Sequence, residues 1–420
     1  MKILKYFAVT LLATVALLVV AILLSATLFR DELANYLSKS NEVHIQRYYI
    51  SDIPIEPENF AEDFKSIHSQ VVKSCSLYKQ KGYDIDSIYT TFANRIGNSV
   101  QTKADYGMML YEYFAALNIG HASPLLNLYA AEYHPAIVEN RVFIDAPNEH
   151  LVNCGFCDKD EVVAINNIPI EQYIDNRKRY ISASTDGYRL RRTQLGVFTS
   201  HTDSIITCDV RRGKDILTLQ LPLICTPQND ALQAHYKVVN DSVGYICIES
   251  MMADVVEDFK QAYEQVKDMP YLIVDVRQNG GGNSGNGRLI AEYLVRNPQK
   301  HCVGGDIIPQ PNAYQGKLFL LTSNCTFSAA ESFTIDLKES GNAILVGEAT
   351  AGDTGCNPQN FISKYGIWFR IPTREPHLSP KGFPMEGVGI EPHYEIKQTT
   401  EDFTNGKDTA IEYILNELCK

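Results

Sequence analysis

Apolar residues between residues 31 and about 130 recur three or four positions apart, which is the spacing of amphipathic helices. One run contains Phe60, Phe64, Ile67, Val71 and Val72, and a second contains Tyr106, Met109, Leu110, Tyr113 and Leu117. This spacing predicts an N-terminal helical domain over residues 31–130, with these side chains in its core.

Between residues 131 and 230 the apolar runs become short and alternate with polar residues, and turn-forming Asp and Asn residues separate them. The pattern predicts strands at Arg141–Ile144, Glu161–Asn166, Ser204–Val210 and Ile216–Pro222. We therefore expect a second, β-rich domain over residues 131–230.

From residue 231 to residue 420, short apolar strands alternate with amphipathic helices. The predicted strands are Val243–Ile248, Tyr271–Val276, Lys317–Leu321 and Ala343–Val346, and the predicted helices are Val255–Val266, Arg288–Val295 and Ser328–Glu339. This alternation is typical of an α/β fold with a mostly parallel sheet covered by helices.

The first 30 residues have a different pattern. Lys2 and Lys5 precede an uncharged apolar run, Tyr6–Phe29, and a bilayer needs about 20 such residues. We expect an uncleaved membrane anchor over residues 1–30, with the rest of the chain outside the cytoplasm, in a bacterial periplasm. A cleaved signal is the alternative, although Ser25-Ala26-Thr27 offers a poor cleavage site.

The composition of the chain limits the kinds of molecule that it can bind. The chain of 420 residues has a net charge of −12 and a pI of about 5.4. It has no Lys/Arg run, and this excludes an ordinary nucleic-acid binder. The ten cysteines permit disulfides outside the cytoplasm. Cys154 and Cys157 have C-x-x-C spacing, for which a local disulfide and two free thiols both remain open.

Ser328 stands between a predicted strand and a predicted helix. A hydroxyl there lies at the positive end of the helix, beside free backbone N–H groups. These are the parts that a nucleophile and an oxyanion hole require. A structural interpretation is also open, because Ser is a preferred N-cap and Glu331 completes a capping box.

A glycine-rich loop, residues 277–285, follows the predicted strand Tyr271–Val276. Its successive glycines let backbone N–H groups point at a ligand. The spacing matches neither common nucleotide-binding pattern. Both this loop and Ser328 follow parallel strands, and open α/β sheets bind their ligands at the carboxyl ends of such strands.

At these loops the sequence resembles family S41, the tail-specific or C-terminal processing serine peptidases, which include the tricorn-type core proteases. Asp275–Gly282 resembles the family's Asp-x-Arg-x-Asn-x-Gly-Gly. Thr326–Glu331 resembles its nucleophile motif, and Gly347–Gly352 resembles the Gly-x-x-Thr-x-Gly that follows. Further similar stretches are Leu117–Ser123, Glu386–Pro392 and, for a PDZ domain, Gly155–Ile170.

The resemblance implies a crotonase-like or ClpP-like αββ core sheet over residues 231–420. It also implies a PDZ-like domain over residues 131–230, after the helical segment and the membrane helix. A PDZ-like domain captures an extended chain by adding it to a sheet edge. No cofactor and no metal ion is implied.

One position departs from the bacterial processing enzymes of the family. Their general-base lysine is replaced here by Asp353, which argues against a Ser-Lys dyad. The tricorn-type branch implies His121 as the base and Glu386 as the residue that holds it, which gives a Ser328–His121–Glu386 arrangement. His393 is the other candidate base.

The resemblance also implies an oxyanion hole made by the N–H of Ala329 and that of Gly281 or Gly282. The tricorn type has a serine beside the histidine as a bridge to the glutamate, but here that neighbour is Gly120. Ser123, a water molecule or a direct contact with Glu386 are the open alternatives for this bridge.

These expectations describe a membrane-anchored serine endopeptidase that hydrolyses peptides or unfolded protein tails. The alternative is a non-catalytic ligand-binding protein on the same fold, like the interphotoreceptor retinoid-binding proteins. An acyl-CoA enzyme of the crotonase fold is disfavoured by the intact serine motif. The sequence leaves the oligomeric state open.

Overall fold

The computed structural model describes residues 45–75, 77–223, 233–252 and 254–419, and residues 47–420 form one structural unit. The expected anchor over residues 1–30 lies outside the described part of the chain. Within that part, no helix combines the length and apolarity that crossing a membrane requires.

The N-terminal part of the described chain is helical, as the spacing predicts. It contains η1 (Pro57–Asn59), α3 (Phe60–Ser74), α4 (Leu77–Gln80), α5 (Ile85–Ala93) and α6 (Lys103–Ala116). Helix α6 begins with a capping box between Thr102 and Asp105. With the exception of Val72, which is 38 % exposed, the apolar residues expected in this core are buried.

A hairpin from the far end of the chain completes the helical part. Strands β17 (Pro358–Ile362) and β18 (Trp368–Pro372) pair with each other, and β18 pairs with β1 (Ser123–Pro124). Phe369 and Ile371 are buried in the same core as α3 and α6. This hairpin lies within residues 231–420 of the predicted peptidase core, but it covers apolar surface of the N-terminal helices.

The middle part is an antiparallel sheet in the order β3-β4-β5-β8-β9, with β6 paired to β5. Its strands are β3 (Ala136–Val138), β4 (Arg141–Phe143), β5 (Glu161–Ile165), β6 (Ile168–Pro169), β8 (Ile205–Arg212) and β9 (Asp215–Pro222). The short pair β2 (Tyr129–Ala130) and β7 (Thr199–Ser200) lies outside this sheet. The four strands predicted here are all present, with ends that differ by one or two residues.

The middle part also contains helices that the apolar pattern does not predict. They are α7 (Glu149–Asn153), α8 (Ile170–Arg177), η2 (Lys178–Tyr180), α9 (Asp186–Leu195) and η3 (Gly196–Phe198). Helix α9 is rich in Arg, and its buried residues, Tyr188, Thr193, Gln194 and Leu195, form no apolar stripe at helical spacing. Its packing against other segments, rather than its own hydrophobic pattern, accounts for it.

The C-terminal part is built on a sheet in the order β10-β11-β12-β15-β16-β19. Its strands are β10 (Ala234–Asn240), β11 (Val243–Ile248), β12 (Tyr271–Asp275), β15 (Lys317–Thr322), β16 (Ala343–Gly347) and β19 (Tyr394–Glu395). Only the edge strand β10 is antiparallel to its neighbour. The carboxyl ends of β12, β15 and β16 therefore lie side by side.

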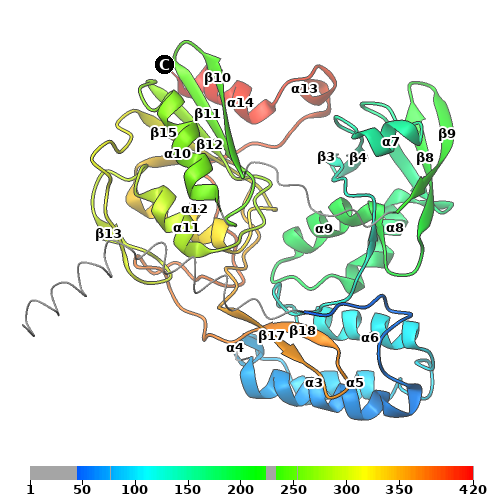
Figure 1. Cartoon of the computed structure of the whole chain (residues 1–420). Helices are drawn as coiled ribbons and strands as arrows, with labels where there is room; N and C mark the ends of the chain where they lie inside the picture. Colours follow the sequence, from blue (N-terminus) through cyan, green and yellow to red (C-terminus); the bar gives the residue numbers. More distant parts are fainter. Residues whose placement is uncertain (1–44, 76, 224–232, 253, 420) are drawn as a thin grey trace, which may run out of the picture. The chain divides into compact units, whose positions relative to one another are not determined.

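Helices cover this sheet on both faces. Helices α10 (Val255–Val266), α11 (Ser284–Ala291) and α12 (Ala329–Ser340) pack on one face (Figure 1). Helix α14 (Thr409–Tyr413) and η4 (Ile414–Leu418) pack on the other. The remaining elements are β13 (Gln299–Lys300), β14 (Asp306–Ile307) and α13 (Thr400–Thr404).

Helix α11 starts four residues before the predicted helix. Asn283 caps it by accepting a hydrogen bond from the N–H of Gly285. Gly287 faces α12 so closely that a Cβ there would lie 3.2 Å from the Cβ of Phe333. A Ser-Gly-Asn-Gly stretch is a poor helix former by itself, so tertiary packing extends the helix over it.

Candidate active site

Ser328 lies where β15 has ended and α12 begins, at the carboxyl edge of the sheet. Its backbone has φ 60° and ψ −122°, a conformation that costs a non-glycine residue about 1–3 kcal/mol. Gly281 permits this turn, because a Cβ at Gly281 would lie 2.6 Å from the Cβ of Ser328. Strain of this kind at an accessible serine is typical of an exposed nucleophile.

His121 lies beside Ser328 although 207 residues separate them in the chain. It follows α6, and its Nε2 lies 3.0 Å from the Oγ of Ser328. The imidazole stacks on the ring of Phe327, with 4.3 Å between the ring centroids, and His121 is 8 % exposed. The structure thus brings together the predicted nucleophile and the predicted base.

The carboxylate next to His121 is that of Asp353. Its Oδ1 lies 2.5 Å from the Nδ1 of His121, and the residue is fully buried. The sequence named Glu386 as the residue that holds His121, with Ser123, a water molecule or a direct contact open as the bridge, whereas in the structure Asp353 is the carboxylate on Nδ1. Asp353 directly follows Gly352, and its side chain lies between the imidazole and Glu386. The backbones of Asp353 and Glu386 form an antiparallel bridge.

Ser184 connects the two acids and is the residue that the sequence did not reveal. Its Oγ lies 3.0 Å from Oδ2 of Asp353 and 2.6 Å from Oε1 of Glu386. It also accepts a hydrogen bond from the N–H of Gly120, at 3.2 Å. A side chain at Gly120 would overlap the carboxylate of Asp353. The bridging hydroxyl therefore comes from a distant segment, immediately before α9.

Ser184 has one hydroxyl proton for two carboxyl groups, so one of these groups must itself carry a proton. Burial and the charge of Asp353 raise the pKa of Glu386 well above its ordinary range. Burial also raises the pKa of Asp353, but His121, Ser184 and the charge of Lys81 together bring it below its usual value. The consistent assignment has Glu386 donating to Ser184 and Ser184 donating to an ionised Asp353.

Basic side chains support the loop that carries His121. The Nζ of Lys81 donates to the backbone oxygen of Asn118, and Arg189 donates to its Oδ1, at 2.5 Å. Asn118 has a left-handed backbone, with φ 52°, where α6 has ended. Ser182 donates to the backbone oxygen of Ile119, at 2.5 Å. These contacts fix the turn immediately before His121.

Glu331 lies beneath the nucleophile and is buried. It accepts hydrogen bonds from the hydroxyl of Thr350 (2.7 Å) and from the N–H groups of Gly352 (2.7 Å), Asp353 (2.8 Å) and Ser328 (3.3 Å). Burial raises its pKa to about 7. Because one carboxyl group holds both Ser328 and Asp353, it fixes the spacing between them.

The predicted oxyanion donors are backbone N–H groups of Gly281 or Gly282 and of Ala329. The N–H of Gly281 is engaged, because it donates to Oδ1 of Asn279, at 2.9 Å. Across the described ranges, the N–H groups of Gly282 and Ala329 have no acceptor. Of the predicted alternatives Gly281 and Gly282, only Gly282 therefore has a free donor to offer together with Ala329.

Two clusters contain side chains of types that can hold a metal ion. They are His235, Cys247 and Glu249, and His301, Cys302 and Asp336. In the second, Asp336 accepts hydrogen bonds from His301 (2.6 Å) and from the N–H of Cys302 (2.9 Å). Neither cluster includes Ser328, His121 or Asp353. The nine described cysteines, Cys154 and Cys157 among them, are free thiols.

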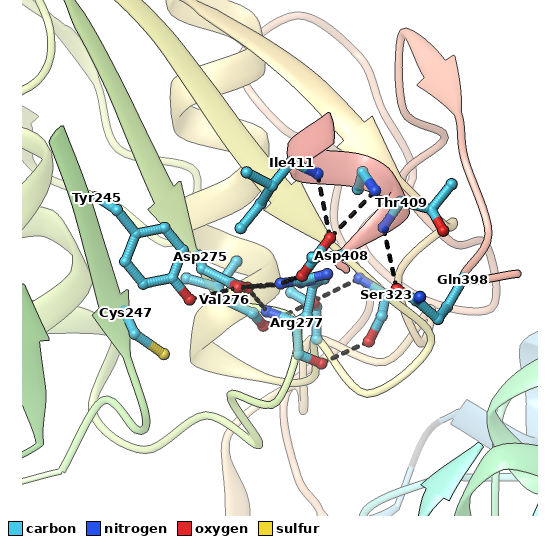
Figure 2. Close-up of polar contacts among 12 residues, drawn as sticks. Tyr245, Cys247, Asp275, Val276, Arg277, Ser323, Gln398, Asp408, Thr409 and Ile411 are labelled. Atoms are coloured by element: carbon cyan, nitrogen blue, oxygen red, sulfur yellow. Dashed lines mark hydrogen bonds and ion pairs between the residues drawn. The ribbon is translucent and has the colours of Figure 1, made fainter. Parts of the chain in front are cut away.

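A second cluster of carboxylates, Asp275 and Asp408, surrounds Arg277 (Figure 2). Arg277 donates to Asp275 through Nη2 (2.6 Å) and to Asp408 through Nη2 (2.7 Å), and Tyr245 donates to Asp275 (2.8 Å). Asp408 in turn caps α14. Ser323 donates to the backbone oxygen of Arg277, at 2.5 Å. This cluster links the glycine-rich loop to the C-terminal helix.

A serine under backbone strain, a histidine on its hydroxyl and a buried carboxylate behind the histidine define a hydrolase site of the serine type. Two family descriptions match the chain. "Peptidase family S41" matches residues 242–396, and "Bacteroidetes, Peptidase, S41 family, N-terminal domain" matches residues 137–223. Together they span more than half of it. The chain belongs to peptidase family S41, a family of serine peptidases.

Among curated proteins, the tricorn protease of Thermoplasma acidophilum is 29% identical over 193 residues, which are 42% of this chain and 17% of that protein. The putative tricorn-like protease C-terminal subunit of Sulfurisphaera tokodaii is 29% identical over 184 residues, 42% of this chain and 21% of that protein. The matched region is therefore about a fifth of the length of these relatives.

Solved structures share the fold. Mature CPAF, in a complex with lactacystin, has a TM-score of 0.69 at 14% identity, over 85% of this chain and 97% of that one. A putative peptidase from Parabacteroides merdae has a TM-score of 0.54 at 18% identity, over 87% and 98%. At these identities the likeness concerns the fold alone.

Proposed function

We propose that the protein is a serine endopeptidase in which Ser328 is the nucleophile, His121 the general base and Asp353 the residue that orients His121. The observation that carries this proposal is the chain of contacts from Ser328 Oγ to His121 Nε2 (3.0 Å) and from His121 Nδ1 to Asp353 Oδ1 (2.5 Å). Glu386 acts one step further away, as a neutral donor to Ser184.

In the first half of the reaction, Ser328 Oγ attacks the carbonyl carbon of the scissile bond while His121 Nε2 takes the hydroxyl proton. The buried negative charge of Asp353 stabilises the imidazolium that forms. The N–H groups of Gly282 and Ala329 bind the oxyanion in this proposal. His121 then gives its proton to the leaving amine, the C–N bond breaks, and an ester on Ser328 remains.

In the second half, a water molecule attacks this ester while His121 accepts one proton from it. Collapse of the tetrahedral intermediate breaks the C–O bond, and His121 returns the proton to Ser328 Oγ. The products are a peptide amine and a carboxylic acid. This sequence needs no group beyond those of the chain and water, because acyl transfer to serine requires only a base and oxyanion donors.

Substrate class and location belong to the same proposal. The substrates are peptides or unfolded protein tails, and the β-rich middle part, proposed as a PDZ-like module, adds an extended chain at a sheet edge. The apolar run Tyr6–Phe29 supports a membrane anchor, with the catalytic part outside the cytoplasm, in a bacterial periplasm.

A fluorophosphonate probe tests the proposal, because it labels only serines that are activated as nucleophiles. The full-length chain, purified in a mild detergent, is expected to be labelled at Ser328. Labelling is expected to be lost in Ser328→Ala and in His121→Ala, while Ser123→Ala serves as a matched control. A folded wild-type chain that is neither labelled nor active would favour a non-catalytic ligand-binding protein on this fold.

A further inference from the structure

His121 and Phe327 line a cavity of about 430 Å³. The cavity also takes in residues from the helical part, from the β17–β18 hairpin and from α9. Because Phe327 directly precedes Ser328, a peptide cleaved at Ser328 would place neighbouring residues in this space. We call it the basic cavity, for the charges it contains.

The basic cavity has a one-sided charge. Its lining includes four arginines and three histidines but no Asp and no Glu, and the arginines are Arg47, Arg177, Arg192 and Arg370. The whole chain has a net charge of −12. A cavity without acidic groups, in so acidic a protein, departs from the average surface and indicates selection for an anionic ligand.

The four arginines also lack internal counter-charges. Within the described residues none of them forms an ion pair, whereas Arg191, the residue before Arg192 on α9, pairs with Glu348 at 2.7 Å. Arg177 donates to Tyr173, Gly196 and Thr199, and Arg370 donates to Asn360. These acceptors are all neutral, so the positive charge in the cavity is left uncompensated.

Neighbouring titratable groups respond to this charge. Burial and the charge of Arg47 lower the pKa of Arg370. Burial and the charge of Arg192 lower the pKa of His134, and burial and the charge of Arg177 lower that of His201 to about 3. All three shifts oppose further positive charge, as expected where cations face each other without an anion.

Arg192 is the arginine best placed for a substrate. It lies one helical turn after Tyr188 on α9, and residues four apart share one face of a helix. The ring of Tyr188 stacks on that of Phe327, with 4.6 Å between the centroids. Arg192 is exposed, and its guanidinium has no acceptor in the part of the chain that the structure describes.

We infer that the basic cavity binds the carboxylate groups of an acidic peptide segment next to the scissile bond, with Arg192 as its principal contact. Guanidinium groups bind carboxylates through two parallel hydrogen bonds, which gives both affinity and orientation. The inference rests on the proposed peptidase function and adds to it a class of substrate. The carboxylates can be side chains or the free end of the peptide.

Binding is measured without turnover in the full-length Ser328→Ala variant, by the anisotropy of fluorescein-labelled peptides. One peptide set carries Glu residues and the other carries Gln at the same positions, each with a free and an amidated C-terminus. The Glu peptides are expected to bind about tenfold more tightly, which corresponds to one charge-assisted contact. Raising the salt concentration should reduce this difference.

Adding Arg192→Gln to that variant should remove most of the preference for Glu. The matched control is Arg211→Gln, which changes the net charge equally but lies in β8 and pairs with Glu161. Its preference should match that of the parent. A preference that follows only the free C-terminus identifies the chain end as the carboxylate.

Equal binding of all four peptides, Glu or Gln with a free or an amidated chain end, would overturn the inference. So would a preference that Arg192→Gln leaves intact. Fluorophosphonate labelling is measured in a separate experiment on the wild-type chain, which retains Ser328. A chain that is labelled but shows no preference for acidic peptides keeps the peptidase and loses only the basic cavity as its substrate site.

Discussion

Two carboxylate clusters at the carboxyl edge of the core sheet are neutralised in different ways. Asp275 and Asp408 share the guanidinium of Arg277, which is a permanent cation. Asp353 and Glu386 share only the hydroxyl of Ser184. The first cluster holds the glycine-rich loop to the C-terminal helix. The second retains a negative charge on Asp353, which stabilises His121 when the imidazole becomes protonated. Among the described residues, the reactive cluster is therefore marked by the lack of a hydrogen-bonded cation, because Lys81 acts on Asp353 and Glu386 only through its charge.

The change with the largest expected effect is Asp353→Asn. An amide cannot stabilise the imidazolium and favours the wrong tautomer of His121, so kcat should fall by about 10³–10⁴ with little change in fold. Hydrolysis of a quenched fluorescent peptide measures the rate, and circular dichroism checks the fold. A loss of less than tenfold would return the role to Glu386.

Arg277→Gln breaks the other cluster. It leaves Asp275, whose side chain is 6% exposed, without its cation. The free energy of unfolding should fall by about 3 kcal/mol, at the low end for a buried pair because Asp408 is partly exposed. Urea unfolding provides the measurement. Arg141→Gln, which removes an exposed pair with Glu161, should cost less than about 1 kcal/mol.

Removing the hydroxyl between the two acids, in Ser184→Ala, should lower kcat by about tenfold, the effect of one lost charge-assisted hydrogen bond. KM should change little, because Ser184 touches Asp353 rather than the substrate. Ser184→Thr, which keeps a hydroxyl, should recover part of the rate. If kcat of Ser184→Ala equalled that of the wild type, the hydrogen bonds that connect Glu386 to Asp353 would not contribute to catalysis.

Glu386→Gln should have the smallest effect on the rate at neutral pH, because glutamine resembles the neutral acid. The effect on stability depends on pH. Since burial raises the pKa of Glu386, its contribution to the free energy of unfolding is fully present below its ordinary pKa and is lost as the pH rises through the raised value.

Glutamine has no proton to lose, so Glu386→Gln should gain stability relative to the wild type as the pH rises. Urea unfolding of both proteins between about pH 5 and pH 9 measures the difference. A difference that stays constant over this range would mean that Glu386 is ionised in the folded chain, and the proton assignment at Ser184 would then be wrong.

The apolar pattern predicted most of the core correctly. Val243–Ile248 and Val255–Val266 are confirmed as β11 and α10 with the bounds expected. These segments carry their own pattern, because α10 buries one face against the sheet and β11, a strand inside that sheet, is buried on both faces. Elements with little periodicity were missed. Helix α9 and the β17–β18 hairpin are both formed by packing against residues far away in the chain.

The residues of the candidate site also divide into those that the sequence predicted and those that it missed. Ser328 and the glycines at 281 and 282 could be placed from local motifs, since a strand, a turn and a helix determine their positions. His121 required a resemblance to a family, and the structure places it on Ser328. Asp353 was recognised as a departure, but its contact with His121 was not predicted. No local signal distinguishes Ser184 from any other serine that precedes a helix.

The sequence by itself determined the α/β core, the nucleophile on its turn and the family, because these depend on periodicity and on contiguous motifs. Only the tertiary structure decided which carboxylate reaches His121 and which hydroxyl joins Asp353 to Glu386. It also gathered four arginines, which form no ion pair among the described residues, around the cavity that His121 and Phe327 line, from segments that lie up to 323 positions apart, Arg47 and Arg370 being the extremes. Such choices depend on distances of a few ångströms between segments that fold together only through their shared cores, and no local pattern records those distances.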